Sequence, residues 1–281
     1  MRPPGGSAEF PPSRKEGAVP LVVSNNIQIS YDDTEPGSNR FPVVFIHAFT
    51  FNRAMWDLQK QVLRAANRVV TYDLRGHGRS EKPITGYGRE NETADLAGLL
   101  EAIRASKVHL VGLSRGGGIA LAFAAAHPEK TASVVAMGVG YDFARTMPEF
   151  EEQRAQTAVT LRSEGLRAAR EHWYNLPIFA SSRENEEVDE KVDAMLIGYT
   201  GAQWLDPTPP ADPPLLDVVS AISAKTLIVV GERDLPGYHT CADELAEKIP
   251  VAEKLTISGA GHLVNLEAPE QTNEAIANFI A

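Results

Sequence analysis

Residues 108–128 read VHLVGLSRGGGIALAFAAAHP and carry the strongest structural signal in this chain. The apolar run from Val108 to Leu113 is typical of a buried strand, and an alanine-rich segment typical of a helix follows at once. Ser114 lies between them in the pattern G-x-S-x-G, with Gly112 and Gly116 on either side. A serine on so sharp a turn requires very small residues at both glycine positions, because side chains there would collide. The alternative is a glycine-rich turn that only precedes a packed helix.

Short apolar runs alternate with helical stretches on both sides of this turn. The other runs are Leu21 to Ser24, Ile27 to Tyr31, Val43 to Ile46, Arg68 to Tyr72, Ala132 to Val139, Thr226 to Val230 and Lys254 to Ile257. The first two predict a hairpin turned at Asn25-Asn26. Helices are expected from Glu92 to Arg104, where leucines recur on one face, and from Pro269 to Ile280. The alternation predicts an α/β fold with a mostly parallel sheet of about eight strands, flanked by helices.

The strands stop in the middle of the chain. Pro148 to Trp173 is rich in Ala, Arg, Glu and Gln and predicts one helix, and Val188 to Tyr199 has a second helical face. Asp206 to Pro214, DPTPPADPP, has five prolines in nine residues and predicts a stiff, extended connector. We therefore expect a helical insert over residues 141–216.

The remaining segments complete the predicted organisation. Residues 21–140 and 217–281 are expected to form one α/β core. Residues 1–20 contain five prolines and three glycines and are expected to be a disordered tail without a signal peptide's apolar stretch. No run of 18 apolar residues predicts a membrane-spanning helix.

Composition narrows the functional classes. The 281 residues include 27 Lys and Arg against 37 Asp and Glu, a formal net charge of −10. This charge argues against nucleic acid or an anionic membrane as partner, because both require a basic surface. The one cysteine, Cys241, excludes an intrachain disulfide framework and a multi-thiolate metal site, and favours a cytoplasmic location. We expect a monomer or homodimer that acts on a small molecule.

A serine hydroxyl is a poor nucleophile unless a base removes its proton. His262, in SGAGHLVNLEAPE, is the preferred base because it follows the last expected strand, as Ser114 follows its own. Active sites of open α/β sheets form at these carboxyl ends. His77, in LRGHGRS, is interpreted as part of a structural turn. The other histidines are His47, His109, His127, His172 and His239.

A carboxylate should orient the histidine. Asp234, in LIVVGERDLP, comes directly after an apolar strand and therefore reaches the same sheet edge. Asp142 is the competing acid, just past the strand that ends near Gly140. Asp234 is preferred because it stands closer to its strand end; its alternative role is that of a helix-cap or turn carboxylate.

Backbone N–H groups are suited to stabilise an oxyanion, because they are rigid and oriented before the reaction begins. One is expected from Arg115, directly after the nucleophile. The second is expected from the loop after the strand VVFI, and Phe49 is chosen within it.

The motifs FIHAF, YDLRGHGRS, GLSRGG, GERD and GAGHLVNLEAP together resemble the α/β-hydrolase superfamily over residues 21–281. The chain is most similar to the branch of small bacterial esterases, enol-lactonases and cofactor-free haloperoxidases, with a helical cap in the insert. The order Ser114, Asp234, His262 is that of the family. Ala48 stands where the branch usually has glycine.

This resemblance implies a serine hydrolase that cleaves carboxylic esters or lactones through an acyl-enzyme, without metal or organic cofactor. Relatives of this fold that hydrolyse epoxides or haloalkanes use an aspartate nucleophile, so Ser114 disfavours those activities. Carbon–carbon bond hydrolysis and perhydrolysis reuse the same triad and remain alternatives. A third alternative is a non-catalytic receptor for a small molecule.

The substrate pocket is expected between cap and core. Candidate lining residues are Phe51, Phe143, Trp173, Tyr174, Phe179, Trp204, Leu235 and Val264. The alternative for the cap aromatics is that they form the cap's own core. The Arg115 side chain has three possible roles: it contacts a substrate carboxylate, pairs with an acid of the cap, or packs sideways.

Overall fold

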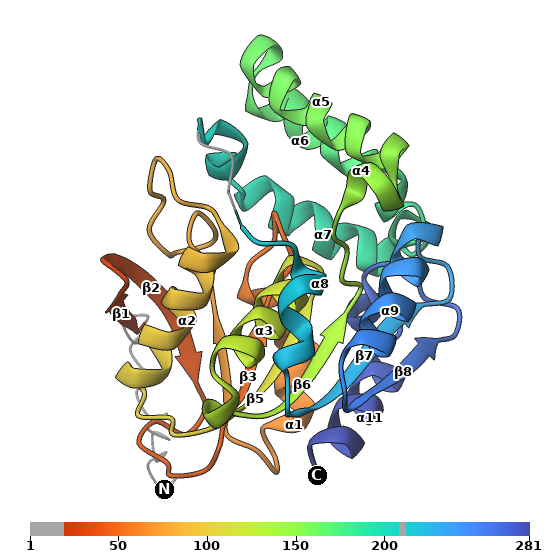
Figure 1. Ribbon diagram of the computed structural model, residues 1–281. Helices are drawn as coiled ribbons and strands as arrows, with labels where there is room; N and C mark the ends of the chain where they lie inside the picture. Colours follow the sequence, from red (N-terminus) through yellow and green to blue (C-terminus); the bar gives the residue numbers. More distant parts are fainter. Residues whose placement is uncertain (1–19, 208–211) are drawn as a thin grey trace, which may run out of the picture.

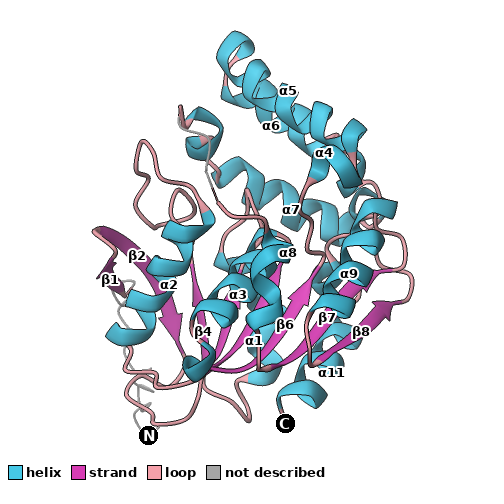
Figure 2. Cartoon of the chain, in the orientation of Figure 1, coloured by secondary structure: helices cyan, strands magenta, loops and turns pink. Residues whose placement is uncertain are grey.

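A sheet of eight strands forms the centre of the molecule (Figure 2). The computed structural model describes residues 20–207 and 212–281, so the predicted tail, apart from Pro20, lies outside the described residues. The strands are β1 Leu21–Ser24, β2 Ile27–Asp33, β3 Val43–Ile46, β4 Val69–Tyr72, β5 Val108–Leu113, β6 Thr131–Met137, β7 Lys225–Gly231 and β8 Ala252–Ile257. Their spatial order is β1-β2-β4-β3-β5-β6-β7-β8.

Six strands, from β4 to β8 in this order, run parallel, and only β1 and β2 pair antiparallel with their neighbours. The predicted mostly parallel sheet is therefore confirmed. The hairpin between β1 and β2 turns at Asn25 and Asn26, whose φ angles are 46° and 63°. Two consecutive positive φ values are typical of the tight turns that match strand twist, and asparagine tolerates them.

Helices cover both faces of the sheet (Figure 1). Helices α2 Arg89–Ala102, α3 Arg115–Ala126, α8 Leu215–Val218 and α9 Pro236–Lys248 lie on one face, and α1 Asp57–Leu63 and α11 Pro269–Ile280 lie on the other. The short α10 Val264–Glu267 precedes α11. Because β3 and β5–β7 have helices on both sides, nearly all their side chains are buried. This arrangement is typical of parallel sheets.

The segment between β6 and β7 is helical in the parts described. It contains α4 Phe143–Thr146, α5 Pro148–Glu164, α6 Leu166–Tyr174 and α7 Glu186–Gly198. The prediction of one helix from Pro148 to Trp173 is wrong, because Gly165 turns the chain with φ 89° and ψ 177°. Only glycine adopts this conformation readily. Figure 1 shows α5 and α6 side by side, farthest from the sheet, with α7 between them and the strands.

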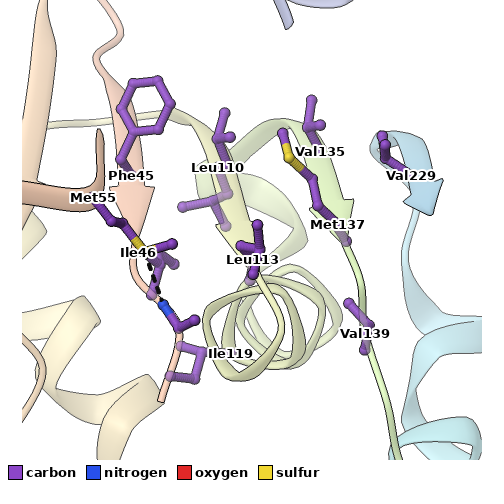
Figure 3. Packing of buried hydrophobic residues seen from close by; sticks show 14 of the residues in the cluster. Phe45, Ile46, Met55, Leu110, Leu113, Ile119, Val135, Met137, Val139 and Val229 are labelled. Atoms are coloured by element: carbon purple, nitrogen blue, oxygen red, sulfur yellow. Dashed lines mark hydrogen bonds between the residues drawn. The ribbon is translucent and has the colours of Figure 1, made fainter. Parts of the chain in front are cut away.

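Buried side chains of neighbouring strands pack on both faces of the sheet, because successive residues of a strand point to opposite sides. Figure 3 shows Phe45 and Ile46 of β3, Leu110 and Leu113 of β5 and Val135 and Met137 of β6, with Ile119 of α3 packed beside them. Each such side chain contributes about 1.5–3 kcal/mol when it leaves water. Cys241 of α9 is also fully buried. The rigid core fixes where each strand ends and therefore where the following loops begin.

Across residues 20–207 and 212–281, we find no helix whose length and hydropathy would let it cross a bilayer.

Candidate active site

Ser114 lies on the turn between β5 and α3 with φ 55° and ψ −113°, a conformation that is unusual for a residue with a side chain. A Cβ at Gly112 would lie 2.2 Å from the carbonyl oxygen of Gly116, and a Cβ at Gly116 would lie 2.1 Å from that of Ile46. The steric requirement inferred from the sequence is therefore confirmed. The N–H of Ser114 donates to the carbonyl of Met137 at 2.7 Å, which ties the turn to β6.

The loops after β7 and β8 bring Asp234 and His262 together. Oδ2 of Asp234 lies 2.8 Å from Nδ1 of His262, and the two side chains are 1% and 3% exposed. Oδ1 of Asp234 accepts the N–H of Leu235 at 2.8 Å. With Nδ1 bound to the carboxylate, Nε2 is the ring nitrogen available to a substrate, and His262 and Ser114 line the same cavity.

The competing acid, Asp142, lies elsewhere. Its carboxylate is 54% exposed and accepts a hydrogen bond from Nε of Arg145 at 2.8 Å. Asp142 has φ 48° at the residue before α4, which places it in the turn that leads into the insert. Of the two candidates, only Asp234 contacts the His262 ring.

The loop after β3 is held by two buried histidines. Nδ1 of His47 contacts the carbonyl of Ala48 at 2.8 Å, and Nε2 of His47 accepts the N–H of Leu74 at 2.9 Å. His77 likewise contacts the carbonyl of Arg75 at 2.8 Å through Nδ1 and accepts the N–H of Thr50 at 3.2 Å. Each ring therefore donates through Nδ1–H and accepts at Nε2.

The protonation of these rings follows from their burial. Desolvation lowers the pKa of His47 to about 4 and holds the pKa of His77 well below its usual value. Both rings are therefore neutral near pH 7, as their paired hydrogen bonds require. The interpretation of His77 as structural agrees with this geometry.

The loop also orients the candidate oxyanion donor. The N–H of Phe49 and the carbonyl of Ala48 belong to one trans peptide and point in opposite directions. Because His47 holds that carbonyl, it also fixes the direction of the Phe49 N–H. The preceding N–H, that of Ala48, donates to Sδ of Met55 at 3.2 Å, drawn as a dashed line in Figure 3. Within the described part of the chain, the N–H groups of Phe49 and Arg115 donate to no backbone carbonyl.

The Arg115 side chain does not pair with an acid of the cap. Its Nε donates to Oε1 of Glu92 at 2.7 Å, and its Nη2 donates to the carbonyl oxygen of Tyr87. Glu92 belongs to α2 of the core and not to the insert, and burial raises the pKa of its carboxyl. The pair fixes the first turn of α3 against α2, and it also borders the cavity.

A cavity of about 180 Å³ opens above Ser114 and His262. Of the predicted lining residues, Phe51, Phe143, Trp173 and Phe179 contribute to it, together with Phe49 and Arg115. The other four do not: Tyr174, Trp204, Leu235 and Val264 lie outside this lining. Trp204 packs behind Phe49 and Trp173, and Val264 is fully buried at the start of α10.

Several lining residues were not predicted, namely Arg89, Glu92, Phe150, Arg154, Ile178, Gln203, Leu215 and Tyr238. Tyr238 is the most consequential, because its ring lies 4.4 Å from that of His262. Burial, and then the charge of Asp234, raises the pKa of Tyr238 well above its usual value, so its hydroxyl stays protonated. Its position one turn after Asp234, in the first turn of α9, was the available signal.

No metal site competes with this constellation in the ranges described, where no group of three or more His, Cys, Asp or Glu side chains is placed to hold an ion.

Comparison with known proteins adds a family context. The profile described as "Alpha/beta hydrolase family" matches residues 43–275. A thermophilic esterase from Thermogutta terrifontis, solved with malate bound, superposes with a TM-score of 0.77 at 28% identity over 94% of this chain and 98% of its own. The enol-lactonase from Burkholderia xenovorans LB400 gives 0.78 at 23% identity, over 93% and 99%. The 2-hydroxymuconate semialdehyde hydrolase of Pseudomonas sp. (strain CF600) is 27% identical over 92% of this chain and 93% of its own.

Proposed function

Because this chain belongs to the alpha/beta hydrolase family, we propose that it is a serine hydrolase of small, apolar or aromatic carboxylic esters or lactones. The family match confirms the resemblance expected from the motifs. The observation that carries the proposal is the hydrogen bond of 2.8 Å between Oδ2 of Asp234 and Nδ1 of His262. It lies at the rim of a cavity that Ser114 also lines. A pure receptor would not require a strained serine, a histidine and a buried carboxylate at one rim.

The proposed reaction begins with attack of Ser114 Oγ on the substrate carbonyl. Nε2 of His262 accepts the hydroxyl proton and later gives it to the leaving alcohol, while Asp234 holds the Nδ1–H tautomer and stabilises the imidazolium. The N–H groups of Phe49 and Arg115 stabilise the oxyanion, and each such donor typically contributes ~3–4 kcal/mol. Water, deprotonated by His262, then releases the acid. In a lactone, the alcohol and the acid leave as one molecule.

The cavity supports modest substrates. Its lining includes six phenylalanine and tryptophan side chains, Phe49, Phe51, Phe143, Phe150, Phe179 and Trp173, together with Ser114. The aromatic part of the lining suits acyl or aryl groups of limited length, while charged side chains, among them Arg89, Glu92 and Arg154, line the rest of the cavity. An esterase at 28% identity is among the structural neighbours, which agrees with ester hydrolysis.

A labelling experiment combined with a substrate panel tests the proposal. We expect a fluorophosphonate to modify Ser114, and purified protein to hydrolyse a short p-nitrophenyl ester. Ser114→Ala should abolish labelling and lower kcat by several orders of magnitude. A panel of lactones and dienoic diketones alongside the esters separates ester hydrolysis from carbon–carbon cleavage. Equal rates for the variant and the wild-type protein would overturn the serine mechanism.

The same assay distinguishes the two candidate acids. Asp234→Asn should lower kcat by about 10⁴, because the amide favours the wrong histidine tautomer. Asp142→Asn, its matched control, removes only an exposed pair with Arg145 and should change kcat less than about two-fold. If Asp142→Asn were the more damaging change, the acid would have to be reassigned.

A further inference from the structure

One hydrogen bond joins the helical insert directly to the loop after β3. Nε1 of Trp173, in α6, donates to Oγ1 of Thr50 at 3.0 Å, although the two residues are 123 positions apart. Trp173 is 4% exposed and Thr50 is fully buried, so water does not compete for either group. The Trp173 ring also meets the ring of Phe49 edge-on, with 5.3 Å between centroids.

Thr50 in turn holds the peptide that follows the candidate oxyanion donor. Its hydroxyl donates to the carbonyl of Phe49 at 2.6 Å, and its own N–H donates to Nε2 of His77 at 3.2 Å. Both polar ends of the peptide between Phe49 and Thr50 are therefore fixed. The residue has φ 68°, which is costly for a β-branched side chain and persists only where neighbours enforce it.

The Thr50 hydroxyl has one proton, which it donates in its hydrogen bond to the carbonyl oxygen of Phe49. Towards Trp173 the hydroxyl can therefore only accept, and the indole N–H can only donate. The two bonds form a chain from α6 through Thr50 to the Phe49 carbonyl, and buried chains of this kind reinforce one another. A displacement of α6 would break the first bond and free the hydroxyl to rotate.

We propose that Trp173 is a positioning residue, which makes the oxyanion-binding geometry of Phe49 depend on where α6 of the insert lies. The proposal rests on the serine hydrolase function proposed above. Trp173 acts through Thr50 and does not itself touch the reacting atoms. A shift of α6 would remove a contact that holds the Phe49–Thr50 peptide, which adjoins the Ala48–Phe49 peptide held by His47.

Trp204 offers a matched comparison within the same aromatic group. Its ring lies 6.0 Å from that of Phe49 and 5.9 Å from that of Trp173, and it is also buried. It makes no hydrogen bond to Thr50, whose Oγ1 is the acceptor for Trp173. Replacing either indole by a phenyl ring removes aromatic packing against Phe49, but only the change at Trp173 removes the hydrogen bond to the loop and part of the cavity wall.

The test compares four variants in steady-state hydrolysis of a short p-nitrophenyl ester. Trp173→Phe and Thr50→Val each remove one partner, and each should lower kcat roughly ten- to hundred-fold with KM within about two-fold, because the loss falls on the transition state. Combining them should lower kcat no further than the worse single variant. Thr50→Ser, which keeps the hydroxyl, should retain most of the activity, and Trp204→Phe should lose less than about two-fold.

A second measurement separates positioning from a general loss of structure. Aryl trifluoromethyl ketones form a reversible hemiketal with a catalytic serine and place an oxyanion in the same site. Their affinity should fall in parallel with kcat in Trp173→Phe, while the thermal midpoint of unfolding stays close to that of Trp204→Phe. If kcat and inhibitor affinity in Trp173→Phe match those of Trp204→Phe, the inference is wrong and the hydrolase function stands. If the wild-type protein neither turns over esters nor labels at Ser114, both proposals fail.

Discussion

Two backbone turns supply the candidate oxyanion donors, and they obtain their conformations in different ways. The turn at Ser114 is fixed by its own sequence, because Gly112 and Gly116 allow the close approach that the strained serine requires. The loop at Phe49 depends on distant partners: His77 lies 27 residues from Thr50, and Trp173 lies 123 residues from it. Glycines of the local sequence therefore make the first turn possible, whereas the second turn depends on side chains that only the fold brings to it.

This difference determines which kind of change would disrupt each turn. A side chain added at the first turn meets backbone that cannot move, so the damage is steric and immediate. The second turn is held by side-chain hydrogen bonds to buried rings, so its integrity depends on their protonation and on the position of the insert. Three changes, from the largest expected effect to the smallest, test this comparison.

The largest effect is expected from Gly116→Ala. The new Cβ would lie 2.1 Å from the carbonyl oxygen of Ile46 and 2.8 Å from that of His47, and neither backbone can yield without moving β3. We expect a loss of about 3 kcal/mol or more in the free energy of unfolding, measured by urea denaturation. Gly118→Ala is the control, because its Cβ would meet nothing within 4 Å. In that helical position alanine should stabilise by up to about 1 kcal/mol. Similar losses in both variants would contradict the steric explanation.

An intermediate effect is expected from acidification. The folded protein holds the pKa of His47 at about 4, whereas the unfolded chain titrates near its reference value of about 6.5. Because the folded pKa is the lower one, the unfolded chain binds more protons between these values. The contribution of neutral His47 to the free energy of unfolding is therefore fully present above about pH 6.5. On the order of 3 kcal/mol of it is lost as the pH falls towards 4.

Urea midpoints measured between pH 7.5 and 4.5 check this expectation. His77 contributes in the same direction, whereas burial raises the pKa of Glu92 and therefore opposes it. The same measurement on His47→Gln isolates the contribution of the His47 ring. The free energy of unfolding of this variant should fall less steeply between pH 7.5 and 4.5 than that of the wild-type protein. An unchanged slope in His47→Gln would show that the second turn does not depend on this proton.

The smallest effect is expected at the hairpin between β1 and β2, another turn specified by its own residues. Asn26 has φ 63°, which glycine adopts with less strain. Asn26→Gly should therefore stabilise the protein by a few tenths of a kcal/mol, since Asn-Gly is the favoured pair in such turns. Thermal unfolding measures the change, and kcat should be unaffected. A loss of stability would argue that the Asn26 side chain has a role that the turn geometry does not explain.

The same distinction accounts for what the sequence could predict. The mostly parallel sheet, the order of strands and helices along the chain and the turn at Ser114 could be predicted from apolar runs and glycine spacing. Both are local signals. Asp234 and His262 were found because parallel strands end at one edge. The structure adds the geometry of the expected pair, with 2.8 Å between Oδ2 of Asp234 and Nδ1 of His262.

Residues whose role depends on a distant partner were not predictable in this way. The pairing of Arg115 with Glu92 joins α3 to α2, and the contact of Tyr238 with His262 depends on how α9 packs. Half of the predicted pocket residues lie outside the lining, because the sequence shows that a segment is apolar or aromatic but not which way each side chain points. The break at Gly165 was missed because a single glycine inside a helical pattern is often tolerated.

The buried Cys241 has a practical consequence for chemistry at the bench. Its thiol is enclosed by α9 and the carbonyl of Tyr141, and burial raises its pKa, so the reactive thiolate is scarce at neutral pH. Maleimide dyes should therefore not label Cys241 in the folded protein. A cysteine introduced on the outer surface of α5 could therefore carry a fluorophore without prior replacement of Cys241, and its emission would report on the surroundings of the insert.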